Sequence, residues 1–235
     1  HPLNTQSVTY ISSRSSVLVT VFYLGALILF FKGFKVWKET GKKVWGCFFG
    51  SGICFLLGGF SKETIVTFPA MLFLFHFYFI SRETPGAWMA TYAKWIFLLA
   101  IPLLALVAYK QFLSEGLLSA SSAHLHPATW FLTQTAVIPF EYFRKMLFPF
   151  NMNIDIDFPI LNDGTQPENW LGIVVLGLFI FFWIRVSRRS SDSDSLEADR
   201  RCVGFGMAWV LLTLMPTSSF IPLLDVAVEH RTYLP

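Results

Sequence analysis

Long apolar blocks separated by short polar stretches dominate this sequence. Each block runs for 15–22 residues, close to the roughly 20 residues that a helix needs to cross a bilayer. Because the hydrocarbon core offers no water to the backbone, we predict that each block is helical. The blocks lie near residues 15–31, 44–60, 64–80, 95–109, 169–184 and 203–224.

The composition agrees with a membrane protein. The 235 residues are 54% hydrophobic and 14% charged, whereas a soluble domain carries roughly a quarter charged residues. A large soluble protein with buried helices is the alternative, but blocks of this length and number have no easy place in one. We therefore predict an all-α fold, a polytopic integral membrane helix bundle with about six spanning helices.

The distribution of positive charge predicts the topology. Loops 32–43, 81–94 and 185–201 hold five, two and five of the 18 Lys and Arg residues. The positive-inside rule places these loops in the cytoplasm, and the serine-rich composition of the third predicts a flexible linker over 185–201. The external face then receives residues 1–14, 61–63, 110–168 and 225–235.

The external segment 110–168 is too long for a simple connection, and loops of this size usually have a function. Residues 129–149 within it are apolar but too short to span twice. We predict an amphipathic helix in the outer interface. A further spanning helix over 129–148 is the alternative, but it would move loop 185–201 outside, against the charge rule. The apolar face comprises Phe140, Phe143 and Leu147, and the charges turned elsewhere are Glu141, Arg144 and Lys145.

Charged groups collect on the predicted external face and mark a candidate site. Arg14 follows Gln6 and Tyr10 at four-residue spacing, and its planar guanidinium suits a phosphate. Lys62 and Glu63 join two apolar blocks almost without a loop, which is costly unless the charges pair or face water. A turn whose charged side chains snorkel to the interface explains them equally well. The functional interpretation is that Lys62 contacts an anionic head group. The candidate residues are Arg14, Lys62, Glu63, Arg144, Glu229, His230 and Arg231.

Other polar groups carry weaker signals. His124 and His126 flank one leucine, but two ligands do not make a metal site. Asp155 and Asp157 share a face of a predicted extended segment. The pattern is compatible with carboxylates that bind sugar hydroxyls, bind a cation or face only solvent. We predict no metal site and no cofactor, and leave a need for a divalent metal open. The cysteines are read as packing residues because no metal-site spacing is present; they are Cys47, Cys54 and Cys202.

Some functions are unsupported by any motif. The sequence contains no P-loop, GxGxxG, HExxH or GxSxG pattern. It also has no basic stripe with interleaved aromatic residues, so nucleic acid is not an expected partner.

Four motifs together resemble a known family. They are His1-Pro-x-x-Thr-x-Ser-Val-x-x-Ile-x-x-Arg14, Lys62-Glu63-Thr-Ile, Thr133-Gln with Tyr142-x-x-Lys-x-Leu-Phe-Pro149, and Glu229-His-Arg-x-Tyr-Leu-Pro235. In this order they resemble the membrane part of the transmembrane and tetratricopeptide-repeat (TMTC-like) O-mannosyltransferases and their bacterial relatives.

The resemblance implies a GT-C type glycosyltransferase. Such an enzyme moves a sugar, for example mannose, from a polyprenyl-phosphate carrier to a protein or other acceptor on the external or lumenal side. By this resemblance Arg14, Lys62 and Arg231 hold the lipid phosphate, and Glu229 and His230 orient them or line the sugar pocket. The leaving phosphate needs charge stabilisation as the glycosidic bond breaks.

Two parts of the family pattern fall outside residues 1–235. The family keeps its catalytic acid in a first external loop upstream of the His-Pro motif, and tetratricopeptide repeats follow the Tyr-Leu-Pro motif, whereas no 34-residue period is present here. We therefore expect a partial GT-C-like domain over residues 1–235 that is inactive alone. The absence of a eukaryotic targeting signal and of cysteine pairs favours a bacterial inner membrane over the endoplasmic reticulum.

Two other classes stay open. A transporter or flippase of a lipid-linked or anionic solute would also gather cations, but it predicts polar residues and broken helices within the spans. Here the main interruptions are Pro69, Pro102 and His76. A non-enzymatic membrane anchor for a repeat domain predicts that neutralising Arg14 or Lys62 affects stability alone.

Overall fold

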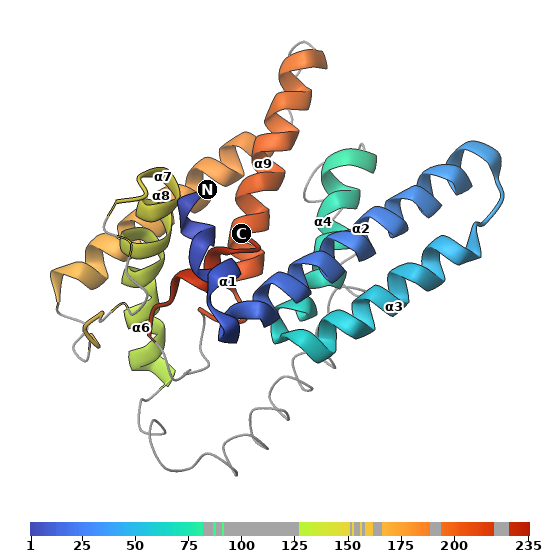
Figure 1. Ribbon diagram of the computed structural model, residues 1–235. Helices are drawn as coiled ribbons and strands as arrows, with labels where there is room; N and C mark the ends of the chain where they lie inside the picture. The colour runs from blue at the N-terminus through green and yellow to red at the C-terminus, as the bar shows by residue number, and fades with distance from the viewer. Residues whose placement is uncertain are drawn as a thin grey trace.

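The described part of the chain is a set of helices packed side by side (Figure 1). This computed structural model describes residues 1–81, 87, 91, 127–150, 152, 156, 158–161, 166–188, 194–218 and 226–235. Over these residues the only β-type pairing is an isolated bridge between Ile156 and Ala227. The predicted all-α class is confirmed.

The described residues form eight α-helices, and short 3₁₀ and π turns lie beside several of them. The α-helices are α1 (Thr5–Thr9), α2 (Arg14–Thr40), α3 (Trp45–Ser61), α4 (Phe68–Phe75), α6 (Pro127–Val137), α7 (Arg144–Leu147), α8 (Pro167–Ser187) and α9 (Asp194–Leu214) in the described chain. The 3₁₀ turns are η1 (Pro2–Asn4), η2 (Ile11–Ser13), η3 (Glu63–Thr67) and η6 (Glu229–Thr232), and the π turns are η4 (His76–Ile80) and η5 (Ile138–Phe143).

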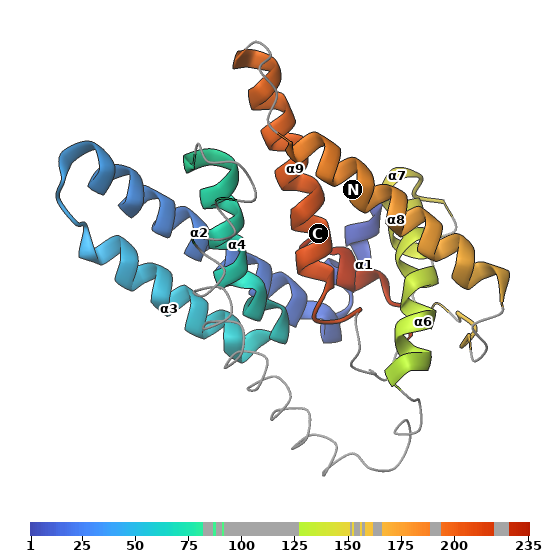
Figure 2. The same ribbon diagram turned by 180° about the vertical axis from the view of Figure 1, so that it is seen from behind.

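Helices α2 and α3 form a hairpin, seen in both Figure 1 and Figure 2. Gly41 ends α2 with φ 69°, and its N–H donates to the Trp37 carbonyl at 2.9 Å. Glycine adopts this left-handed conformation without the steric cost of a Cβ. Farther along, the buried Ser51 hydroxyl donates to the Ala26 carbonyl at 2.8 Å, which joins the two helices in their middle.

Helix α9 closes the core formed by α2, η3 and α4. The Tyr23 and Thr67 hydroxyls are 3.0 Å apart, and the Tyr23 ring meets Phe68 and Trp209 edge-on. Such edge contacts add to the stability gained from buried aromatic area. The buried residues of this core are Val19, Tyr23, Ala26, Leu27, Ile65, Phe68 and Met71.

A second contact joins α6 to α8. A Cβ at Gly172 would collide with the Thr135 carbonyl oxygen and lie 2.9 Å from the Ala136 Cα. Glycine therefore lets the two backbones approach closely, as small residues do between membrane helices. Helical structure extends over Pro127–Leu147 through α6, η5 and α7, which covers the predicted external helix; its place in the outer interface stays a prediction.

Three described helices are long and apolar enough to cross a membrane: Arg14–Thr40, Glu63–Ile80 and Pro167–Ser187. Trp45–Ser61 is apolar but shorter. Predicted block 95–109 lies outside the described residues. The block at 203–224 is not a span candidate among them, because α9 begins with charged residues and ends at Leu214.

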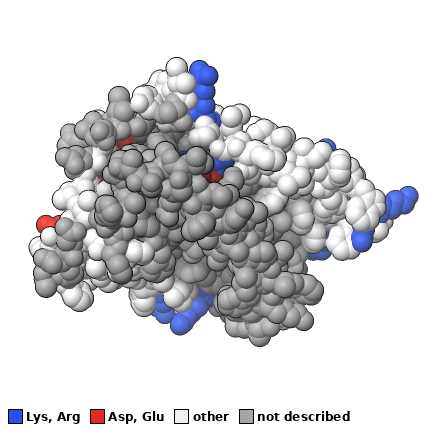
Figure 3. Space-filling view, turned by 90° about the horizontal axis from the view of Figure 1, so that it is seen from below, with Lys and Arg blue, Asp and Glu red and all other residues white. Residues whose placement is uncertain are grey.

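The α2–α3 hairpin exposes apolar surface. Figure 3 shows this part of the molecule as a white surface with Lys and Arg near its far end. Exposed apolar side chains also follow α8. Apolar surface of this extent fits contact with lipid. The exposed residues include Val21, Leu24, Ile28, Phe49, Leu56 and Phe60 of the hairpin and Val174, Leu178, Phe181 and Phe182 of α8.

The described helix ends nearest the basic loops lie on one side of the bundle. The end of α2, the end of η4 and the start of α9 lie toward the top of Figure 1, and the α3–η3 junction lies near the bottom. Of the predicted linker 185–201, residues 194–201 are the first turns of α9, and Arg200 donates to the carbonyls of Arg185 and Arg188. Which side faces the cytoplasm stays a prediction.

Candidate functional site

The segment 226–235, which we call the strap, ties several parts of the bundle together. The Gln134 amide donates to the Val226 carbonyl at 2.9 Å, and the Trp209 indole donates to the Leu234 carbonyl at 2.9 Å. Ala227 pairs with Ile156. Within the strap, η6 lies against η1 and α1, so the two ends of the chain meet (Figure 1).

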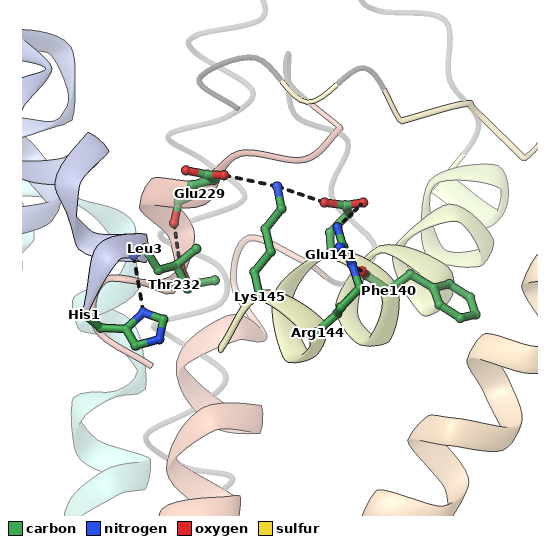
Figure 4. A network of polar contacts seen from close by, with 8 residues as sticks. All are labelled: His1, Leu3, Phe140, Glu141, Arg144, Lys145, Glu229 and Thr232. Carbon is green, nitrogen blue, oxygen red and sulfur yellow. Dashed lines mark hydrogen bonds and ion pairs between the residues drawn. The ribbon is translucent and has the colours of Figure 1, made fainter. Parts of the chain in front are cut away.

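A buried ion-pair network attaches the strap to α7 (Figure 4). The Lys145 ammonium lies 3.0 Å from Glu141 Oε2 and 3.1 Å from Glu229 Oε1. The Lys145 and Glu229 side chains are only 3% and 4% exposed. Arg144, which is exposed, lies 3.7 Å from Glu141 and donates to the Phe140 carbonyl.

The π turn η5 positions this network locally. It widens the helix just before α7, starting near Pro139, and carries Glu141 four residues before Lys145. π turns are rare and occur frequently at functional sites. The network contains two acids, Glu141 and Glu229, and two bases, Arg144 and Lys145, so their charges balance. Balanced, hydrogen-bonded charges of this kind hold structure in place rather than attract a charged ligand.

A second cluster has a different character. The Lys62 ammonium donates to the Ser16 hydroxyl at 2.9 Å, at the junction of α3 and η3. Burial lowers the pKa of Lys62 to about 8; Glu63 opposes this shift and Arg231 adds to it. The Arg231 guanidinium donates to the Val226 carbonyl at 3.2 Å. Because the charge of Arg231 lowers the pKa of Lys62, the two cations lie close enough to repel each other.

His230 belongs to the same cluster. Burial, followed by the charges of Lys62 and Arg231, lowers its pKa to about 4. The imidazole is thus neutral at pH 7 and able to accept or donate a hydrogen bond. We call Lys62, His230 and Arg231 the cation cluster. Two cations and a neutral imidazole in a largely buried place favour an anion with several acceptor oxygens, and Glu63 offsets part of the positive charge.

The structure divides the predicted site into two groups. It places Lys62, His230 and Arg231 near enough for their charges to act on one another, with Glu63 beside Lys62. Glu229, from the same set, instead pairs with Lys145, and Arg144 pairs with Glu141.

Arg14 is exposed at the start of α2, two residues before Ser16. Arg144 and Glu229 thus belong to the buried ion-pair network, and the grouping of Arg14, Arg144 and Glu229 with the cation cluster in a single site stays a prediction. His124, His126, Asp155 and Asp157 lie outside the described residues.

Sequence reasoning missed the roles of Lys145 and Ser16. Lys145 was assigned to the polar side of an interfacial helix, whereas it is buried. The only local signal was Glu141 at i−4, a spacing that pairs charges on one helix face. Ser16 gave no signal, because its partner Lys62 is 46 residues away.

The described residues contain no group of three or more His, Cys, Asp or Glu side chains that could hold a metal ion. Comparison of the chain with protein-family models, curated proteins and solved structures finds no match.

Proposed function

We propose that the protein is a membrane glycosyltransferase of the GT-C type. It would move a sugar such as mannose from a polyprenyl-phosphate carrier to a protein acceptor on the external face of a bacterial inner membrane. One observation carries the proposal: of the four motifs of the family resemblance, which extend from His1 to Pro235, the first three contact or approach the strap, and the strap contains the fourth.

The first three motifs reach the strap in different ways. The first motif contributes η1 and α1, which lie against η6. The second contributes Lys62, whose charge acts on His230. The third contributes Lys145, which pairs with Glu229 of the fourth. The motifs are far apart in sequence, and their convergence on one segment supports the proposal. In it the Lys145–Glu229 pair holds the strap in place, and the cation cluster contacts the donor.

The cation cluster supplies the chemistry that the donor requires. A polyprenyl-phosphate sugar breaks at the bond between the sugar carbon and phosphate oxygen, and negative charge grows on the departing phosphate. Lys62 and Arg231 would donate hydrogen bonds to its oxygens, because fixed donors stabilise developing charge without reorganisation. The apolar α2 and α3 surfaces beside Lys62 suit the carrier's hydrocarbon chain.

The test is sugar transfer from a radiolabelled polyprenyl-phosphate sugar in membranes that contain the protein at its full natural length. Lys62→Gln and His230→Asn should lower transfer, with about a hundredfold loss for the lysine, the size of effect seen when one charge-stabilising donor is removed. Lys62→Arg should keep much of the activity. Lys35→Gln is the matched control, because Lys35 is exposed and pairs only with Glu39 in the described contacts.

Two outcomes would contradict the proposal. Full activity of Lys62→Gln at equal expression would show that the cation cluster takes no part in the reaction. No transfer from any donor, together with movement of the intact donor across the bilayer, would favour a flippase instead.

A further inference from the structure

The end of the α2–α3 hairpin has a chemistry of its own. Residues 32–45, which we call the basic tip, contain five exposed lysines and one acid, Glu39. The tip lies at the opposite end of α2 and α3 from Lys62 (Figure 1). The lysines are Lys32, Lys35, Lys38, Lys42 and Lys43.

Lys43 is held between two indole rings. Its ammonium lies 5.3 Å from the centre of the Trp37 ring and 5.5 Å from that of Trp45. The rings come from the end of α2 and the start of α3, and the left-handed Gly41 forms the turn between them. Two cation–π contacts fix the ammonium without neutralising its charge.

The tip also marks a boundary between apolar and polar surface. Exposed apolar side chains follow α2 and α3 up to the tip, for example Ile28 and Phe49. Trp37 and Trp45 are themselves exposed by 40% and 70%. Tryptophan at the end of an apolar helix is typical of the level of the lipid head groups.

We propose that the basic tip binds the phosphate head group of an anionic phospholipid, with Lys43 as the central contact. Lys42 and Lys38 would complete the charge, and the two indoles would lie between the head group and the acyl chains. The bilayer is the occupant that the apolar faces of the same two helices already require, and positive charge beside it attracts anionic lipid. Lys35 contributes less because Glu39 lies 3.9 Å from its ammonium.

The test measures lipid binding by the purified chain in mild detergent, with native mass spectrometry. The probes are phosphatidylglycerol, phosphatidylcholine as the neutral lipid, and inorganic phosphate as a soluble competitor. Phosphatidylglycerol should bind more tightly than phosphatidylcholine. Lys43→Gln should weaken its binding about fivefold, the effect of one lysine near an anionic surface. Lys43→Arg should bind as the natural chain does.

The matched control is Lys35→Gln, which removes the same charge from the same tip. A loss below about twofold in this variant is expected, since its charge is already paired. Equal losses in Lys35→Gln and Lys43→Gln would overturn the proposal, because total charge alone would explain them. Equal affinity for the two lipids, or displacement of lipid by inorganic phosphate, would overturn it as well. Retained helicity and unfolding temperature in each variant would exclude misfolding as the cause.

Discussion

Lys145 and Glu229 lie 84 residues apart in the chain, yet Lys145 Nζ and Glu229 Oε1 are 3.1 Å apart in the interior. This ion pair fastens the strap to α7 immediately before His230 and Arg231. The same strap carbonyl, that of Val226, accepts hydrogen bonds from Gln134 and Arg231. The position of the cation cluster therefore depends on contacts made by segment 127–147.

Lys145→Met should destabilise the protein by about 3–5 kcal/mol, because it leaves the buried Glu229 without its ammonium. Thermal or denaturant unfolding in detergent, followed by circular dichroism, measures the change. Glu229→Gln should also destabilise, and the double variant Lys145→Met/Glu229→Gln should lose less than the sum of the single losses. An unfolding temperature for Lys145→Met equal to that of Lys35→Gln would show that the buried pair is dispensable.

Gly172→Ala should destabilise the α6–α8 contact by about 1–3 kcal/mol, the usual cost of overpacking. The new methyl group would meet the Thr135 backbone, which has no flexible end that could move aside. Gly177→Ala, in the same helix, has no atom within 4 Å of the new Cβ. It should leave stability unchanged or raise it by about 0.5–1 kcal/mol through helix propensity. Unfolding curves for the pair compare the two positions, and equal effects would contradict the close packing.

Binding of an anion at the cation cluster should weaken as the pH rises above about 8. The pKa of Lys62 is about 8, so the ammonium that holds the anion is lost above this value. Stability changes in the opposite direction: the unfolded chain binds more protons between pH 8 and the ordinary pKa of 10.5, so stability rises across that interval.

Isothermal titration with a short-chain prenyl phosphodiester measures this pH dependence, because a phosphodiester keeps a constant charge over the range. Lys62→Arg should bind with little change between pH 7 and 10, since an arginine stays protonated there. The same decline with pH in Lys62→Arg would assign the effect to another group.

Tyr142→Phe should leave stability unchanged or raise it by about 1 kcal/mol. The Tyr142 hydroxyl is buried and has no hydrogen-bond partner within the described structure, and an unsatisfied buried polar group costs free energy. Unfolding measurements and the transfer assay together separate two roles. A stable variant that loses sugar transfer would indicate that the hydroxyl serves a substrate, whereas a clear loss of stability would contradict the absence of a partner.

Much of the secondary structure follows from the sequence alone. The apolar blocks at 15–31, 64–80 and 169–184 predicted helices that the structure extends at one or both ends, by nine residues at the end of the first and by one to three residues elsewhere. These predictions succeed because an apolar run of this length has one stable backbone arrangement in lipid. The block at 203–224 was less accurate, because α9 begins in the charged stretch before it.

The candidate site was only partly predictable. The sequence marked Lys62, His230 and Arg231 by charge type at the ends of apolar blocks, and the structure brings them together. It gave no reason to bury Lys145 or to turn Glu229 toward it, because a charge pattern cannot show which of several acids a base will meet. That choice needs the path of the chain between them.

The sequence by itself determined the class of the protein, its helices and the separation of basic loops from the motifs. These features follow from local hydropathy and charge, which act over a few turns of helix. Only the tertiary structure decided that the strap joins both ends of the chain, that the ion pair and the cation cluster are separate, and that Lys43 lies between two indoles. Each of these depends on contacts between elements, which no local pattern specifies.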